Sequence, residues 1–199
     1  MLKVDNVGFC YKKDDWLFRH INLTCQRGEV IGIYGDSGIG KSTFAKLITS
    51  YLRPTEGEIN VPHKLNNKSN PVQLIWQHPE RAINPKWKLS KIFVEASDLD
   101  SEIMQWMDIN DEWLKRYPGE LSGGELQRFC IARSLGKHTR FIIADEITSM
   151  FDTVTQAQIW NMLLNITEER GIGMLVISHN IELLNRISHH LIDFNEFSN

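Results

Sequence analysis

Gly35-Asp36-Ser37-Gly38-Ile39-Gly40-Lys41-Ser42 decides the fold: it follows the apolar run 30–34 and precedes a helical pattern that begins near Lys41. It matches G-x-x-x-x-G-K-[ST] in the strand-then-helix context of a phosphate-binding loop. The glycines let successive backbone N–H groups point inward at an oxyanion, while Lys41 adds a positive charge at the β and γ phosphates. The Ser42 hydroxyl is placed to bind Mg²⁺. We therefore expect a triphosphate site formed by Gly35, Ser37, Gly38, Gly40, Lys41, Ser42 and Thr43.

Length and composition predict one domain. With 199 residues, 42% of them hydrophobic, the chain can bury one core with a smaller lobe inserted in it. A formal net charge of −3 disfavours nucleic acid as a direct partner. Three widely spaced cysteines without a C-x-x-C pair predict reduced thiols in a cytoplasmic protein, and the histidines lack transition-metal spacing. Because no stretch approaches roughly eighteen apolar residues, we expect neither a secreted nor a membrane-spanning chain.

The N-terminal part of the chain has the pattern of strands. Apolar and polar residues alternate over residues 2–11 and 21–25, as in half-buried strands, and the run 30–34 predicts a third strand. The helix after the glycine-rich loop is expected to carry apolar residues as far as Leu52 and to end before Pro54. A polar, turn-rich segment over 60–70 then precedes a strand over 72–76.

The pattern changes at residue 78. Residues 78–119 show no strand pattern and predict an inserted helical lobe. A helix beyond Gly124, a strand over 141–144, a helix capped by Thr153 and a strand over 174–177 follow. Apolar strands that alternate with helices predict an α/β fold, here a P-loop NTPase core with a mostly parallel sheet covered on both faces, N-terminal antiparallel strands and an inserted α-helical subdomain.

Two carboxylates follow the apolar run 141–144. Asp145 and Glu146 come at the C-terminal end of a buried strand, which is the edge where open α/β sheets present ligands. We expect Asp145 to take part in the Mg²⁺ shell. Glu146 is suited to orient and deprotonate a water that attacks the γ-phosphate.

A second glycine-containing anion site is expected at Leu121-Ser122-Gly123-Gly124-Glu125, where Ser122, Gly123 and Gly124 open a helix. Alone, this segment would be an ordinary capped helix start. Together with Lys41 and the pair Asp145-Glu146, it resembles the signature L-S-G-G-[QE] of the ATP-binding cassette (ABC) ATPases. The resemblance covers essentially the whole chain, and its motifs occur in family order.

The resemblance implies roles for four further residues. Tyr11 matches the aromatic residue that stacks on adenine, although Trp16 is a second candidate for that role. Gln77 matches the Q-loop glutamine that contacts Mg²⁺ and the attacking water. Asp152 matches the D-loop aspartate at the seam between two cassettes, and His179 matches the switch histidine that hydrogen-bonds the γ-phosphate.

The segment around Gln77 is more similar to one group of ABC ATPases than to the family in general. Gln77-His78-Pro79 followed by Asn84-Pro85 is similar to the oligopeptide, dipeptide and nickel importer ATPases. Ile147 stands where the wider family usually has proline, as in the short second ATPase of nickel or metallophore importers. The resemblance implies a single ABC ATPase domain over 1–199, with a core of 1–77 and 120–199 and a lobe over about 78–119.

The same resemblance implies ATP and Mg²⁺ as cofactors and an assembly at the cytoplasmic face of the membrane. The expected partners are transmembrane permease subunits, a second ABC ATPase in a homodimer or heterodimer, and an extracytoplasmic solute-binding protein reached through the permease. The transported solute would be a peptide, nickel or a metal chelate. One alternative is a soluble ABC ATPase that acts on nucleic acid or ribosomes; another is a regulator that binds nucleotide without hydrolysing it.

Overall fold

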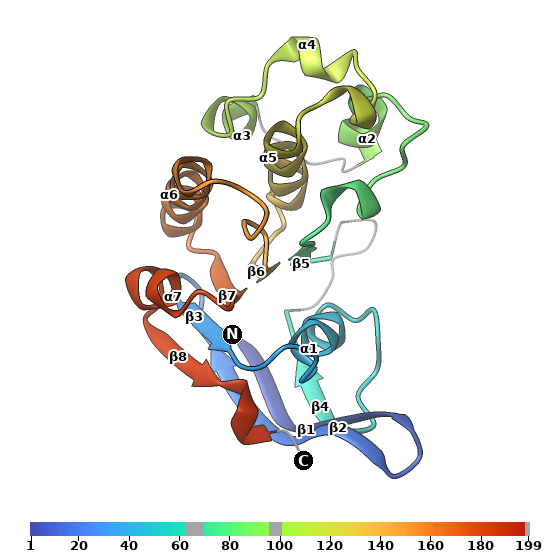
Figure 1. Ribbon diagram of the computed structural model, residues 1–199, viewed down its shortest axis with the longest axis vertical. Coiled ribbons are helices and arrows are strands. Elements are labelled where there is room, and N and C mark those ends of the chain that lie inside the picture. Colours follow the sequence, from blue (N-terminus) through green and yellow to red (C-terminus); the bar gives the residue numbers. More distant parts are fainter. Residues whose placement is uncertain (63–69, 96–100, 198–199) are drawn as a thin grey trace.

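A computed structural model describes residues 1–62, 70–95 and 101–197 of the chain (Figure 1). The strands are β1 (Leu2–Lys12), β2 (Asp15–Cys25), β3 (Val30–Tyr34), β4 (Glu56–Asn60), β5 (Val72–Ile75), β6 (Phe141–Asp145), β7 (Gly173–Ile177) and β8 (His190–Asp193). The α-helices are α1 (Lys41–Ile48), α2 (Leu89–Glu95), α3 (Ser101–Trp106), α4 (Asp111–Leu114), α5 (Gly123–Ser134), α6 (Thr153–Glu169) and α7 (Ile181–Ile187). Short 3₁₀ turns are η1 (Pro79–Arg81), η2 (Pro118–Glu120) and η3 (Phe194–Phe197).

The central sheet has five parallel strands in the order β5-β6-β7-β3-β8, which confirms the predicted α/β class. Successive side chains of a strand point to opposite faces, and β6 shows this directly. Ile142 and Ala144 pack with helices α5 and α6, whereas Phe141 and Ile143 pack with α1 and the N-terminal strands. Both faces of the sheet are therefore covered, which explains the continuous apolar runs in its strands.

A three-stranded antiparallel sheet, in the order β2-β1-β4, lies below α1 in Figure 1. Its apolar side chains, such as Val4 and Phe18, join Phe44 and Leu47 of α1 in one buried cluster. This layer holds α1 against the central sheet and so fixes the loop that precedes the helix. The predicted N-terminal strands are confirmed by this arrangement.

Helices α2, α3 and α4 form a lobe at the top of Figure 1, joined to the core through α5. Leu89, Ile103, Met107 and Trp113 of this lobe belong to the same buried cluster as Phe129 of α5. The lobe therefore shares a core with α5 instead of folding around one of its own.

Three expectations about elements were wrong or incomplete. α1 ends at Ile48, before the expected Leu52, because Ser50 has a left-handed φ of 64° and Tyr51 N bonds back to Lys46 O. Asp152, not Thr153, caps α6, since its carboxylate accepts the first free N–H groups. Strands β4 and β8 and helix α7 were not predicted. Most of the polar segment over 60–70, residues 63–69, lies outside the described residues.

Candidate active site

The loop between β3 and α1 leaves the start of α1 open to a ligand. Gly40 is the N-cap, with a φ of 112°, and no described side chain caps the helix. A Cβ at Gly40 would lie 2.8 Å from Phe18 Cδ1, so both the backbone conformation and the space require glycine. Uncapped N–H groups at a helix N-terminus attract anions. The predicted loop residues therefore surround a site suited to phosphate.

Lys41 lies inside this loop and is only 6% exposed. Its Nζ donates to the backbone oxygens of Gly35 and Asp36, both at 2.7 Å. Burial lowers the pKa of the ammonium group, and the nearby Glu146 and Asp145 carboxylates oppose that shift. The backbone oxygens thus hold the ammonium group in position, where phosphate oxygens can replace them as acceptors.

A cavity of about 470 Å³ collects most of the predicted site residues. It is lined by Ser37, Gly38, Gly40, Lys41, Ser42, Thr43, Gln77, Glu146 and His179. These residues come from the loop before α1, from the first turn of α1 and from the segments that follow β5, β6 and β7. Because parallel strands present their carboxyl ends at one edge, residues as far apart in the sequence as Ser37 and His179 line the same cavity.

Asp145 ends β6 and is 7% exposed. Burial raises the pKa of its carboxyl group, and a hydrogen bond with Ser42 opposes the shift. Its Oδ1 is buried and has no hydrogen-bond partner among the described residues. An unpartnered buried carboxylate oxygen beside a serine hydroxyl fits a hard cation such as Mg²⁺, which prefers oxygen ligands.

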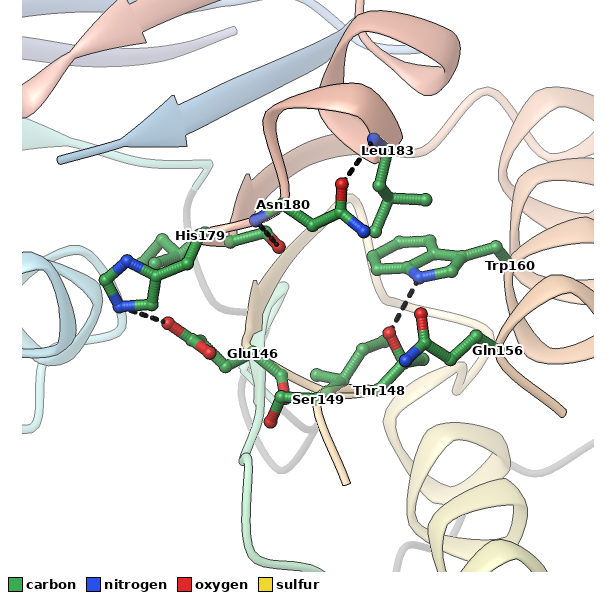
Figure 2. A pocket seen from close by; sticks show the side chains of 11 residues that line it. Glu146, Thr148, Ser149, Gln156, Trp160, His179, Asn180 and Leu183 are labelled. Carbon is green, nitrogen blue, oxygen red and sulfur yellow. Dashed lines mark hydrogen bonds and ion pairs between the residues drawn. The ribbon is translucent and has the colours of Figure 1, made fainter. Parts of the chain in front are cut away.

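Glu146 occupies an unusual backbone conformation, with a φ of 51°, and its N–H donates to Ile177 O at 3.0 Å. Its Oε1 lies 2.9 Å from His179 Nε2, as the dashed line in Figure 2 shows. Burial raises the pKa of the Glu146 carboxyl group, Asp145 adds to the shift and His179 opposes it. The geometry places a carboxylate and an imidazole together at the mouth of the loop cavity. Such a pair can move or hold a proton.

Glu146 and His179 also line a second, smaller cavity of about 240 Å³ (Figure 2). In it the indole Nε1 of Trp160 donates to Thr148 Oγ1 at 2.9 Å. This contact ties the segment after β6 to α6, so it supports the strained backbone that carries Glu146.

Gln77 is connected to Glu146 by hydrogen bonds through Ser149, a residue for which the sequence predicted no role. Its Nε2 donates to Ser149 Oγ at 3.2 Å, and Ser149 Oγ donates in turn to Glu146 O at 3.0 Å. Ser149 therefore links the end of β5 to the end of β6. The only signal for it in the sequence was its place three residues after Glu146.

Tyr11 is 65% exposed and lies beside the first turn of α1. Its hydroxyl is 3.0 Å from Thr43 Oγ1, and its ring meets Phe9 edge-to-face at 4.9 Å between centroids. The competing Trp16 is covered by the guanidinium of Arg19, 4.3 Å from its ring centroid. This geometry favours Tyr11 over Trp16 as the exposed aromatic platform near the loop.

The signature residues lie in a different cavity. Ser122 and Gly124 line a space of about 400 Å³ together with Asp152. Ser122 caps α5 in a reciprocal pair with Glu125: Ser122 Oγ accepts from Glu125 N at 3.3 Å, and Glu125 Oε2 accepts from Ser122 N at 2.7 Å. The described structure thus divides the predicted residues into two sets, one around Lys41 and one around Ser122.

The fold and the loop cavity define a P-loop ATPase, and the cavity at Ser122 and Gly124 adds the signature of a cassette. Residues 18–149 match the ABC transporter family. The chain belongs to this family: it binds nucleotide and is an ATPase.

Relatives agree with this assignment. The nickel import system ATP-binding protein NikE of Staphylococcus aureus is 35% identical, over 96% of this chain and 85% of NikE. A dimeric ATP-binding cassette, MJ0796, solved with ADP and Pi, superposes with a TM-score of 0.80 at 25% identity, covering 97% and 94% of the two chains. CbiO1 of Clostridium perfringens, part of the cbiONQ transporter complex, has a TM-score of 0.80 at 22% identity, over 96% and 83% of the chains, and supports the fold alone.

Proposed function

We propose that this chain is the ATP-hydrolysing subunit of an ABC importer. The observation that carries the proposal is the Glu146–His179 pair, 2.9 Å apart, at the mouth of the cavity that holds Lys41. A carboxylate held by an imidazole beside a phosphate loop is suited to activate water for attack on a γ-phosphate.

Each loop residue has a defined task in this proposal. The backbone N–H groups of Ser37, Gly38 and Gly40 surround the β-phosphate, and Lys41 neutralises the β and γ oxygens. Tyr11 stacks on the adenine. Glu146 accepts a proton from the attacking water, and His179 keeps the carboxylate oriented and hydrogen-bonds the γ-phosphate.

The residues suited to hold Mg²⁺ are Ser42, Gln77 and Asp145. The unpartnered Oδ1 of Asp145 and its hydrogen bond with Ser42 support this assignment. When bound, the cation neutralises the charge that develops on the β and γ phosphates. Ser42, Gln77 and Asp145 would hold the cation at the carboxyl edge of the sheet.

Two chains form the complete catalytic unit in this proposal. The signature cavity contains Ser122 and Asp152 but not the phosphate loop, so neither set completes a site around one nucleotide in a single chain. A head-to-tail pair places each ATP between Lys41 of one chain and Ser122 and Gly124 of the other. Ser122, Gly123, Gly124 and Asp152 thus act across the seam, in a homodimer or with a second ABC ATPase.

We further propose that the lobe over residues 78–119 docks transmembrane permease subunits, with the core over 1–77 and 120–199 binding nucleotide. Within the described residues, no helix combines the length and apolarity needed to span a bilayer. The protein would sit peripherally at the cytoplasmic face of the membrane, and a solute-binding protein would deliver cargo to the permease. NikE belongs to a nickel import system, so nickel, a metal chelate or a peptide is the proposed cargo class.

Co-expression with permease subunits of a nickel or peptide importer tests the proposal. Membrane vesicles carrying the complex should take up radioactive nickel or a peptide in an ATP-dependent way, and Glu146→Gln in the same complex should not. Recovery of the chain on RNA or ribosomes, without permease association, would instead support the soluble ABC alternative.

A further inference from the structure

Helix α5 lies between the lobe helices and the central sheet (Figure 1). Its N-terminus carries the signature residues, and its buried face packs against β5 and η1, the two elements that flank Gln77. A rigid helix in this place can connect three parts of the machinery. The side chains in the middle of α5, Gln127, Arg128 and Cys130, make the contacts that would connect them.

Gln127 is fully buried on α5, with 0% of its surface exposed. Its Nε2 donates to the backbone oxygen of Trp76 at 3.4 Å, immediately before Gln77. Its Oε1 has no hydrogen-bond partner among the described residues. Burying an amide with an unpartnered oxygen is unfavourable, so a leucine or methionine would serve packing as well or better. Packing alone therefore does not account for an amide at this position.

Cys130 makes a second contact to the same segment, about one helical turn further along. Its Sγ donates to Pro79 O at 3.7 Å. Burial raises the pKa of this thiol to about 12, so it stays protonated and remains a donor. Gln127 and Cys130 thus hold the backbone on both sides of Gln77 and His78.

Arg128, next to Gln127, faces the lobe. Its Nη1 is 2.9 Å from Asp108 Oδ2 and 3.4 Å from Met107 O, and its guanidinium lies 5.1 Å from the centre of the Trp113 ring. Adjacent residues of α5 therefore reach the lobe on one side and the Q-loop on the other.

We propose that Gln127 is a positioning residue that couples α5, and through Arg128 the lobe, to the placement of Gln77 in the nucleotide site. The inference rests on the proposed function, because it acts through Gln77. When the lobe moves relative to the core, Arg128 carries α5 with it, and Gln127 transmits that displacement to the Trp76 carbonyl.

The test uses Gln127→Met in the full chain. Methionine keeps the length of the side chain and removes the amide, so the melting temperature should stay within a few degrees of wild type or rise. ATP hydrolysis at saturating MgATP should fall roughly 10- to 100-fold, as expected when a catalytic group is misplaced by about 1 Å, while the KM for ATP stays near wild type. Ser134→Ala is the matched control, because it removes a buried hydrogen bond, from Ser134 Oγ to Cys130 O at 3.0 Å, that stays within α5.

Two further measurements separate positioning from general damage. In the Gln77→Ala background, Gln127→Met should add no further loss of activity. Hydrogen exchange should speed up in peptides covering residues 73–83 and stay unchanged in peptides covering the rest of α5. If Gln127→Met does not fold, Gln127→Leu takes its place in the same assays.

Wild-type turnover in a folded Gln127→Met or Gln127→Leu chain would overturn the inference, as would equal losses with and without Gln77. Faster exchange throughout α5 would also overturn it, because it would show a structural role only. Failure of the proposed function would give a different result: the wild-type chain would not hydrolyse ATP even as a homodimer or with a second ABC ATPase, or Glu146→Gln would hydrolyse it at the wild-type rate.

Discussion

Helices α1 and α5 both begin at glycine-containing segments, but they differ in side-chain capping and in the charge at the helix start. α1 starts at Gly40 without a described side-chain cap and carries the buried cation Lys41. α5 starts at Ser122, whose capping box with Glu125 satisfies the N–H groups of these two residues and places a carboxylate at the helix start. The first helix start therefore combines uncapped N–H groups with a cation, whereas the second combines a side-chain cap with a carboxylate.

This difference indicates where one chain alone can bind nucleotide. At α1 the open N–H groups, the cation and the catalytic pair share one cavity. At α5 the cavity contains Ser122, Gly124 and Asp152 but no residue of the phosphate loop, so we expect the signature to contribute only when a nucleotide is brought to it on another chain. We therefore expect variants at α1 to change binding by the isolated chain and variants at α5 to change only the assembled dimer.

The largest expected effect is on hydrolysis at the α1 cavity. Glu146→Gln keeps the size of the side chain and removes the base, so hydrolysis should fall roughly 10²- to 10⁴-fold while ATP binding survives. The closed pair should then accumulate, and size-exclusion chromatography with light scattering should show a dimer only with MgATP.

One outcome of that experiment would contradict the mechanism, and another would exclude one of the two possible pairs. Hydrolysis by Glu146→Gln at the wild-type rate would show that Glu146 is not the base. A variant that binds ATP but stays monomeric at every accessible concentration would refute the homodimer and favour a distinct partner cassette.

The next effect compares the two helix starts directly. Lys41→Ala removes the buried charge that meets the phosphates, so MgATP binding by the single chain should weaken on the order of 10²-fold. Ser122→Ala should leave that affinity within about two-fold and reduce hydrolysis only in the dimer. Isothermal titration calorimetry measures both affinities. Equal losses in the two variants would show that both helix starts bind the same nucleotide within one chain.

Much of the nucleotide site could be predicted because its chemistry is local in sequence. The loop before α1 and the pair Asp145-Glu146 each follow an apolar strand, and parallel strands bring their carboxyl ends together. The family resemblance added Gln77 and His179, which no local pattern identifies.

Other features depend on tertiary contacts and left little trace in the sequence. Ser149 acquires its role only because the ends of β5 and β6 are adjacent. Gln127 looks like an ordinary helical glutamine until its burial against Trp76 is seen. The end of α1 was misplaced because the left-handed turn at Ser50 overrides the apolar period that extends to Leu52.

A smaller effect is expected from the aromatic platform beside α1. Tyr11→Ala should weaken ATP binding by about 1–3 kcal/mol, the worth of one base-stacking contact. Tyr11→Phe is the matched control: it keeps the ring and loses only the hydroxyl contact with Thr43, so most of the affinity should remain. Comparing ATP with inorganic triphosphate in calorimetry gives a second check, because equal wild-type affinities would mean that no adenine platform exists.

The smallest effect concerns the cap of α5 and its dependence on pH. The Ser122 backbone hydrogen bond is the main cause that holds the pKa of Glu125 below its usual value. A carboxyl group with a lowered folded-state pKa stabilises the fold above its unfolded pKa, near 4.5, and loses that contribution as the pH falls through the folded value. Glu125→Gln keeps an acceptor oxygen for the cap but removes the charge. Hydrogen exchange in the first turn of α5 should therefore be slightly faster in the variant at pH 7, and the difference from wild type should vanish as the pH falls below 4.5. A difference that stays constant from pH 7 to acid would show that the charge on Glu125 does not stabilise the cap, and the contrast between the two helix starts would then rest on Lys41 alone.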